Sequence, residues 1–243
     1  AFGVYSGVLE TDPKHLAALI RRGHIFLLSG APDKAMEDAE TALTEDPGNV
    51  DALVLRSAAQ RRSGNAEAAL ADARAAIDAD PKNKNAVAML ASLLSEQGDV
   101  DQALSLVEGA LEMHPDALDL HLLLARLYSN KGEPDKAVGQ LEKMVALKPD
   151  NLTIRVQLAA YLAGQNKLDE AEQVLRSAVA DLPESVEAKL GLIQFLGSRR
   201  SADRAEQTLQ DFVTAEPDVY RLRFALADLY QAMGQPDKMT AVY

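Results

Sequence analysis

The 243-residue sequence contains no cysteine and no tryptophan, and aromatic residues make up only 5% of it. The absence of cysteine excludes disulfides and thiolate chemistry, and it is compatible with both reducing and oxidising compartments. Scarce aromatic residues and abundant alanine suit tightly packed helices better than a β-sandwich or barrel. We therefore predict an all-α protein.

Basic residues are also in the minority. With 25 Lys and Arg against 37 Asp and Glu, the net charge is −12 and the isoelectric point is near 4.8. This charge repels phosphate backbones and anionic membranes, which argues against nucleic acid as a partner. No apolar run approaches the roughly 20 residues of a membrane helix, and no signal peptide precedes Ala1. We expect a soluble protein without direct membrane insertion. Its alanine-rich composition favours a bacterial origin, in either cytoplasm or periplasm.

The ten prolines reveal an internal repeat, because a residue that breaks helices marks boundaries wherever it recurs. Seven of them follow one another at intervals of 34 residues: Pro13, Pro47, Pro81, Pro115, Pro149, Pro183 and Pro217. The other three lie in the similar phrases GAPDKA, GEPDKA and GQPDKM, which are 102 residues apart, three times 34. All ten prolines therefore occupy two phases of one 34-residue repeat.

Repeats numbered from 1 to 34, beginning three residues after each marker proline, align in columns. Position 20 is alanine in six of seven repeats, position 8 is small in six, and position 7 is leucine in the last five. Small residues let two helices approach closely, while larger ones fill the space around them. Each repeat is thus predicted to form a packed pair of helices, A and B. The predicted single domain, 1–243, has units at 1–15 (partial), 16–49, 50–83, 84–117, 118–151, 152–185, 186–219 and 220–243 (partial).

The recurring phrase predicts the turn between the two helices. Glycine at position 15 can adopt the left-handed conformation that ends helix A, and proline at position 17 can begin helix B. An acidic residue stands at position 18 in all seven repeats. There it meets the positive end of the helix dipole, which stabilises the helix by roughly 0.3–1 kcal/mol. The phrase is predicted to separate helices, not to bind phosphate.

These columns resemble the tetratricopeptide repeat, whose 34-residue signature has a leucine and a small residue early, an aromatic residue at position 11, alanine at 20 and 27, and proline at 32. The resemblance covers the whole chain and implies an all-α, right-handed superhelical solenoid of antiparallel helix pairs. Arg22 and Arg56 replace the usual leucine in repeats 1 and 2, and repeat 6 carries Gly191, Ile193 and Gly197 in helix A. We expect these repeats to pack less regularly, with repeat 6 as the soft spot.

Both ends of the sequence fall within a predicted helix B. Ala1 corresponds to position 20 of a preceding unit, and Tyr243 to position 24 of the seventh. A solenoid needs a polar capping helix over its last apolar face, and the sequence contains none. We expect either a fragment of a longer array or a chain that pairs its open ends with another copy.

Catalytic motifs are absent from the sequence. The four histidines form no HExxH motif and no i, i+4 pair, and there is no G-x-S-x-G, P-loop or dinucleotide fingerprint. We interpret the histidines as surface or groove residues. Carboxylates such as Glu170 and Glu172 are expected on the solvent side of helix B. The prediction is no catalytic residue, no metal and no cofactor, hence no enzyme activity.

The resemblance implies a binding groove on the A helices, where positions 2, 5, 6, 9, 12 and 13 tend to face a ligand. These 42 positions hold five basic and five acidic residues here, so the expected groove is neutral and partly apolar. The residues predicted to contact a partner are His24, Arg61, Arg62, Met89, Leu122, Leu123, Arg126, Val156 and Ala160. In one interpretation the three arginines bind an acidic peptide beside an apolar floor. In the other, each arginine only pairs with a nearby acid such as Glu96 or Asp119.

A neutral, partly apolar groove predicts a non-enzymatic scaffold that binds a protein or peptide segment, within a larger bacterial assembly. The positions that chaperone-binding members of the family use to clamp a terminal carboxylate do not carry the required Lys, Asn and Arg, which disfavours that mode. Two alternatives stay open. The chain could self-associate through uncapped ends, or it could be the docking arm of an enzyme whose catalytic domain lies outside it.

Overall fold

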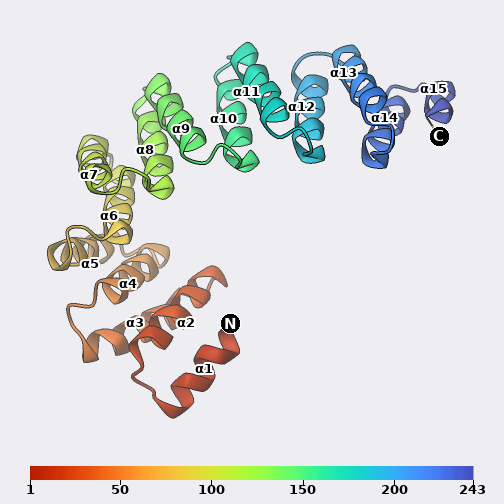
Figure 1. The fold of residues 1–243 in the computed structure, drawn as a ribbon. Coiled ribbons are helices and arrows are strands. Elements are labelled where there is room, and N and C mark those ends of the chain that lie inside the picture. Colours follow the sequence, from red (N-terminus) through yellow and green to blue (C-terminus); the bar gives the residue numbers. More distant parts are fainter. Residues whose placement is uncertain (243) are drawn as a thin grey trace. The chain divides into compact units, whose positions relative to one another are not determined.

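The computed structural model describes residues 1–242, and these form fifteen α-helices and no strand (Figure 1). The predicted all-α class is confirmed. By contacts the chain divides into two compact units, Ala1–Ala137 and Val138–Tyr243, hereafter unit 1 and unit 2. A single solenoid domain over 1–243 stays a prediction, and Tyr243, assigned to a helix B from the sequence, lies outside the described residues.

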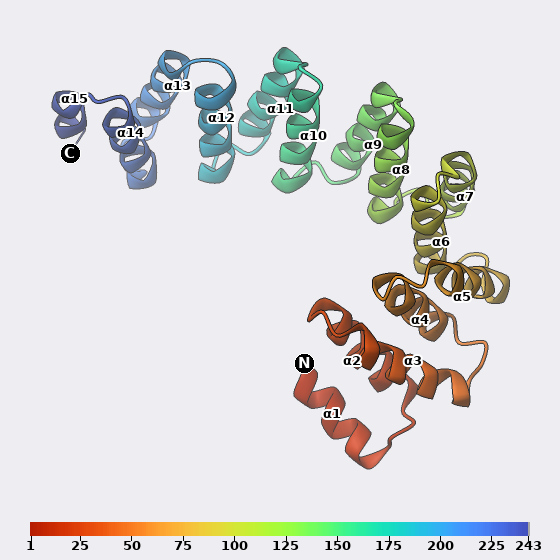
Figure 2. The same ribbon diagram turned by 180° about the vertical axis from the view of Figure 1, so that it is seen from behind.

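The helices recur with the period of the prolines. The first helix is α1 (Phe2–Thr11). The A helices, which begin every 34 residues, are α2 (Leu16–Leu28), α4 (Val50–Arg62), α6 (Lys84–Glu96), α8 (Leu118–Lys131), α10 (Leu152–Gly164), α12 (Val186–Arg199) and α14 (Tyr220–Ala232). The B helices, also 34 residues apart, are α3 (Pro32–Glu45), α5 (Ala66–Ala79), α7 (Val100–Met113), α9 (Pro134–Leu147), α11 (Leu168–Asp181), α13 (Ala202–Ala215) and α15 (Pro236–Ala241). Figure 2 shows the same helices from behind.

The turn between helices A and B has the predicted chemistry. All five glycines at position 15 have positive φ angles, and the three prolines at position 17 are the first residues of their B helices. In repeat 5 the left-handed residue is Asn166, with φ 61°. Repeat 6 differs, since Arg200 ends α12 with φ −122°. Position 15 is therefore left-handed in six of the seven repeats.

The start of most A helices is capped by a side chain at position 34 of the preceding repeat. Asn49, Asn83, Asn151 and Ser185 each accept a hydrogen bond from a backbone N–H in the first turn. His15 does the same through Nδ1, which lies 3.2 Å from the backbone nitrogen of Ala18. Such caps satisfy N–H groups that a helix leaves unpaired at its start. His15 is thus a structural residue of the helix boundary.

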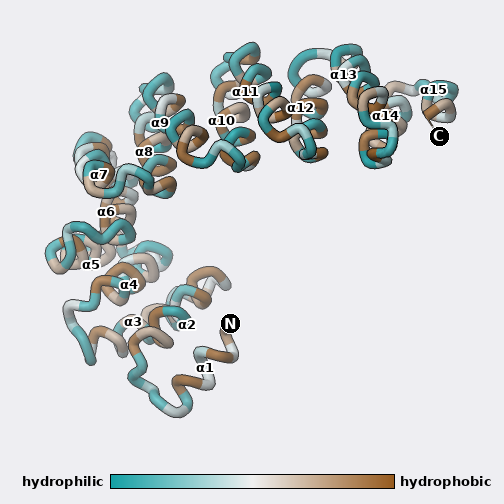
Figure 3. The backbone as a smooth tube through the Cα atoms, viewed as in Figure 1, coloured by the Kyte–Doolittle hydropathy of each residue, from teal (hydrophilic) through white to brown (hydrophobic). Residues whose placement is uncertain are grey.

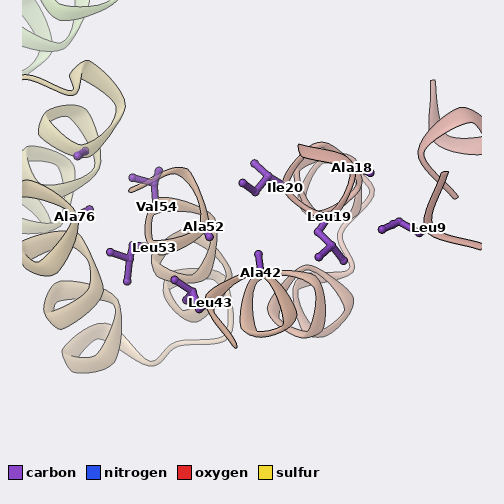
Figure 4. Close-up of a cluster of buried hydrophobic side chains, with 11 residues drawn as sticks. Leu9, Ala18, Leu19, Ile20, Ala42, Leu43, Ala52, Leu53, Val54 and Ala76 are labelled. Carbon is purple, nitrogen blue, oxygen red and sulfur yellow. The ribbon is translucent and has the colours of Figure 1, made fainter. Parts of the chain in front are cut away.

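Small residues bring helices A and B into contact. The six alanines at position 20 have no exposed surface: Ala35, Ala69, Ala103, Ala137, Ala171 and Ala205. Figure 3 shows both hydrophobic and hydrophilic residues on the helices, as expected where helices are partly buried against their neighbours. In unit 1, Leu9 of α1 points toward Leu19 of α2 within a buried cluster that continues through α3 and α4 to α5 (Figure 4).

The unusual arginines of repeats 1 and 2 are accommodated by ion pairs. Arg22 donates to both carboxylate oxygens of Asp38, at 3.0 and 2.6 Å, and Arg56 binds Asp72 in the same way at 2.7 Å for both bonds. Hydrogen bonding to these buried carboxylates raises the pKa of each guanidinium, so both stay charged. The expected irregularity of these repeats is not observed, since α2 packs extensively against α3 and α4 against α5. The bidentate ion pair between positions 7 and 23 takes the place of the usual apolar contact.

The close approach at position 8 generates a stability prediction. Gly23 of α2 is buried, and a Cβ added there would lie 2.4 Å from Cδ2 and 3.3 Å from Cγ of Leu55, which is itself fully buried and would have to shift. We expect Gly23→Ala to lower the free energy of unfolding by about 1–3 kcal/mol through overpacking. Urea denaturation of the purified chain measures this.

The matched control is Gly109→Ala, in the exposed middle of α7, where an added Cβ meets no atom within 4 Å. This variant should gain roughly 0.5–1 kcal/mol, because alanine loses less backbone entropy in a helix than glycine does. Equal stabilisation by both substitutions would show that α2 and α4 are not in close contact at Gly23.

Candidate functional site

Successive A helices contact one another throughout unit 1 and at one point in unit 2. In unit 1, α2 contacts α4, α4 contacts α6 and α6 contacts α8, while in unit 2 α12 contacts α14. Successive B helices make no comparable contact with one another among the described residues. The A helices therefore lie nearer to one another than the B helices do, and side chains between them can act on one ligand together.

The first hollow on this surface lies in unit 1, between the A helices of repeats 1 to 3. Its volume is about 330 Å³, and we call it hollow 1. It brings together three of the residues predicted from the sequence, namely His24, Arg61 and Met89. The remaining lining residues are Asp51, Val54, Asn85, Ala88 and Ser92. Hollow 1 thus has an apolar floor and a polar rim.

The charged groups of hollow 1 are only weakly engaged. Arg61 Nη1 lies 3.3 Å from Glu96 Oε1, and both side chains are exposed, by 36% and 57%. Exposed pairs of this kind contribute roughly 0–1 kcal/mol, so Arg61 can exchange Glu96 for another carboxylate at little cost. Burial, and secondarily the charge of Arg21, lowers the pKa of His24. The imidazole is therefore neutral at pH 7, and Arg61 is the cation that faces the hollow.

The other predicted residues of unit 1 have separate environments. Arg62 donates through Nη1 to the backbone oxygen of Leu27 at 2.8 Å, which satisfies a carbonyl in the last turn of α2. Arg126 is exposed, and no described carboxylate lies within ion-pair distance of it. Leu122 and Leu123 on the same helix, α8, are partly buried. The three arginines therefore differ: Arg61 pairs with Glu96, Arg62 supports a helix end, and Arg126 is available.

A second hollow lies within unit 2, between α10 and α12. Its volume is about 260 Å³, and we call it hollow 2. It contains the two predicted residues of this unit, Val156 and Ala160, and Val156 is 42% exposed. The remaining lining residues are Ala159, Ala163, Leu175, Gly191, Gln194, Phe195, Ser198 and Arg199. Most of this lining is small or apolar.

One carboxylate in unit 2 was wrongly expected to face solvent. Glu172 is only 6% exposed, and it accepts hydrogen bonds from Arg176 and Arg204 at 2.9 Å and from Arg200 at 3.0 Å. Arg200 also pairs with the exposed Asp169. Glu170, two residues earlier, is exposed as expected. Because the charge of Glu172 is surrounded by guanidinium groups, the carboxylate joins repeat 5 to repeat 6.

A column of buried basic residues was also missed. Position 4 holds His121, Arg155 and Lys189 in repeats 4 to 6, and all three are at most 5% exposed. The ring of His121 contacts the backbone oxygen of Pro115 at 2.8 Å, Arg155 donates to that of Pro149 at 2.9 Å, and Lys189 pairs with Glu216. The interpretation of every histidine as a surface or groove residue is thus wrong for His121. Recurrence at one repeat position was the signal that could have revealed these residues.

The described residues contain no group of three or more histidine and acidic side chains placed to hold a metal ion. Over the same residues, none of the helices has the length and apolar character needed to cross a membrane. His114, like His121, binds a backbone oxygen, that of Lys82 at 3.0 Å. Three of the four histidines therefore have structural contacts, and His24 alone of the four lines a described hollow.

Comparison with protein families agrees with the 34-residue repeat pattern. Sequence models described as tetratricopeptide repeat match 60–110, 94–160, 131–190 and 162–218, and another with the same description matches 33–84. Together they cover 33–218, well over half of the chain. The chain belongs to the tetratricopeptide repeat family. The fold of this family is typical of protein–protein interaction scaffolds. No curated protein sequence matches the chain.

Solved structures of this family resemble the chain. A thermophilic tetratricopeptide repeat protein of Thermus thermophilus is 26% identical, with 74% of this chain and 98% of that one covered and a TM-score of 0.57. PilF of Pseudomonas aeruginosa is 18% identical, with 88% and 97% covered and a TM-score of 0.61. A tetratricopeptide repeat protein from Parabacteroides merdae is 19% identical, with 93% and 90% covered and a TM-score of 0.54. All three are bacterial proteins, which fits the origin favoured by the composition, and the last two show the fold alone.

The Glu172 network leads to a second stability prediction. Glu172→Gln removes the charge that three arginines share and leaves donors without an ionised acceptor, so the free energy of unfolding should fall by about 1–3 kcal/mol. The neighbouring change Glu170→Gln, at an exposed site of the same helix, should alter it by less than about 0.5 kcal/mol. Chemical denaturation of both variants makes the comparison. Indistinguishable midpoints would mean that the arginines do not depend on Glu172.

Proposed function

We propose that this chain is a non-enzymatic scaffold that binds a protein or peptide segment along the surface of its A helices, as part of a larger bacterial assembly. The observation that carries the proposal is hollow 1, where A helices of three repeats place an apolar floor beside weakly engaged polar groups. Membership of a family whose fold is typical of interaction scaffolds supports it. The absence of enzyme activity belongs to the same proposal.

The chemistry of hollow 1 suits a peptide. Val54 and Met89 offer apolar contact, and the side-chain amide of Asn85 has no described partner, so its donor and acceptor can both bind a peptide group. Arg61 supplies a cation held only by an exposed carboxylate. A segment with an apolar side chain and a nearby carboxylate would satisfy all of these groups. Arg126, on α8, is a further cation of unit 1 with no ion pair among the described residues.

Charge reversal tests this proposal with a matched pair in repeat 2. Peptides enriched from a random library on the wild-type chain are measured against Arg61→Glu, on the A helix, and Arg74→Glu, at an exposed site of the B helix α5. A charged hydrogen bond of roughly 1.5–3 kcal/mol corresponds to a loss of about 10- to 150-fold in affinity. At least one enriched peptide family should lose this much with Arg61→Glu and retain its affinity with Arg74→Glu, with helicity unchanged.

The opposite pattern would contradict the proposal. Loss of binding with Arg74→Glu, and no loss for any peptide family with Arg61→Glu, would place the partner on the B helices. Adding Arg126→Glu to Arg61→Glu extends the test to α8, because this second arginine has no described ion pair to break.

Self-association is a second candidate function, favoured by apolar side chains that are exposed in the structure. Phe2 and Val4 on α1 are 44% and 67% exposed, and Tyr220 at the start of α14 is 63% exposed. If these side chains join copies, the mass measured by light scattering should fall on dilution of the wild type and stay monomeric for Val4→Asp. A mass that does not change with concentration for either protein would exclude this candidate.

A further inference from the structure

Gly191 leaves a vacancy on the A-helix surface of unit 2. Position 6 of helix A carries Leu55, Met89 and Leu123 in repeats 2 to 4, and Met89 lines hollow 1. Repeat 6 has glycine at this position, in the interior of α12. An added Cβ on Gly191 would meet no atom within 4 Å. Open space therefore exists where three other repeats place a large apolar side chain.

The walls of hollow 2 are built around this vacancy. Ala160 and Ala163 of α10 face it with small side chains, while Leu175 and Phe195, at most 9% exposed, provide buried apolar surface. The helices α10 and α12 also lack the close backbone approach that joins α12 to α14. A cavity of roughly 150 Å³ with apolar walls is enough to hold a benzene ring. Hollow 2, at about 260 Å³, accommodates one large apolar side chain.

The rim of hollow 2 carries a cation that pairs with no carboxylate among the described residues. Arg199 is exposed, and no described carboxylate lies within ion-pair distance of it. The next residue, Arg200, is in contrast bound by Glu172 and Asp169. No acidic residue lines the hollow, although the whole chain has a net charge of −12. The complementary ligand is thus apolar at one point and negatively charged nearby.

We propose that hollow 2 is a specificity pocket for a leucine, methionine or phenylalanine side chain of a bound protein segment, with a carboxylate of the same segment paired by Arg199. This inference rests on the proposed function, because it takes the A-helix surface as the place of binding. It adds the chemistry of the partner: an apolar residue close to an acidic one. The vacancy at Gly191 is what selects for the apolar residue.

The probes are tetrapeptides with an acetylated N-terminus and an amidated C-terminus, and each contains one Leu, one Asp and two Gly. Every order of these residues is tested, and each peptide is also made with Leu→Ala and with Asp→Asn. They are titrated into the full chain with labelled methyl groups, and NMR follows the signals of Val156, Ala160 and Ala163. At least one Leu/Asp order should shift these signals. Its Leu→Ala version should bind about tenfold or more weakly, since it buries less apolar surface.

Two substitutions then test the pocket separately. Gly191→Leu fills the vacancy and should abolish the shifts of Val156 and Ala160, while Gly109→Leu, the same change on the exposed side of α7, should leave them unchanged. Arg199→Glu should weaken the Asp peptide about tenfold or more and leave the Asn peptide unaffected. Because Arg199 is exposed, this variant keeps the inference testable even if Gly191→Leu fails to fold.

Several results would overturn the inference. Equal binding of the Leu and Ala peptides, shifts that persist with Gly191→Leu, or no shift with any peptide would each contradict it. Shifts confined to Val54 and Ala88 of hollow 1 would also contradict it and leave the proposed function intact. Shifts confined to methyl groups of the B helices would contradict both.

Discussion

The close contact between helices A and B at position 20 is the constraint on which the rest of the structure depends. Alanine there is completely buried in six repeats, so the two helices meet with no room for a larger side chain. In a solenoid each repeat contacts only its neighbours, and one tight contact repeated along the chain sets the geometry of every pair. Within unit 1 the A helices also contact one another in series, and the hollows that their side chains leave unfilled are the proposed binding surface.

Two different polar devices reinforce this apolar framework. In repeats 1 and 2, arginine at position 7 reaches a buried aspartate at position 23 of the same repeat. In repeats 4 to 6, a buried basic residue at position 4 instead holds the loop before helix A or the end of helix B. Removing one partner of such a buried pair is costly. These residues are therefore structural, and the proposed recognition involves exposed groups such as Arg126 and Arg199.

The period, the helix boundaries and the turns could be predicted because each depends on local chemistry. Proline sets the start of helix B and a left-handed residue ends helix A, so a repeating pattern of both marks the pairs. The left-handed conformation of Asn166 was not predicted, because asparagine adopts positive φ angles less often than glycine does. Glu172 was misjudged because two of its three partners, Arg200 and Arg204, come from the next repeat. Whether a side chain points toward the next repeat depends on how the repeats pack, and the spacing of residues in the sequence does not reveal this.

In the candidate site, too, some features could be predicted from the sequence and others depend on packing. Of the partner-binding residues predicted from the sequence, His24, Arg61 and Met89 line one hollow. Sequence spacing could not separate Arg62 from Arg61, because adjacent residues on a helix point in different directions and only the structure shows Arg62 bound to Leu27. Hollow 2 exists because Gly191 has no side chain and those of Ala160 and Ala163 are small, and a small residue leaves a hollow only where the neighbouring helix does not fill the space.

Site-specific photo-crosslinking tests most directly whether the A-helix surface is where partners bind. A photoreactive amino acid at the exposed Asn85 of α6 is compared with the same amino acid at the exposed Ser105 of α7, in the same repeat, using peptides enriched on the wild-type chain. The account predicts a covalent adduct from position 85 and none from position 105. Adducts formed at position 105 and absent at position 85 would contradict it.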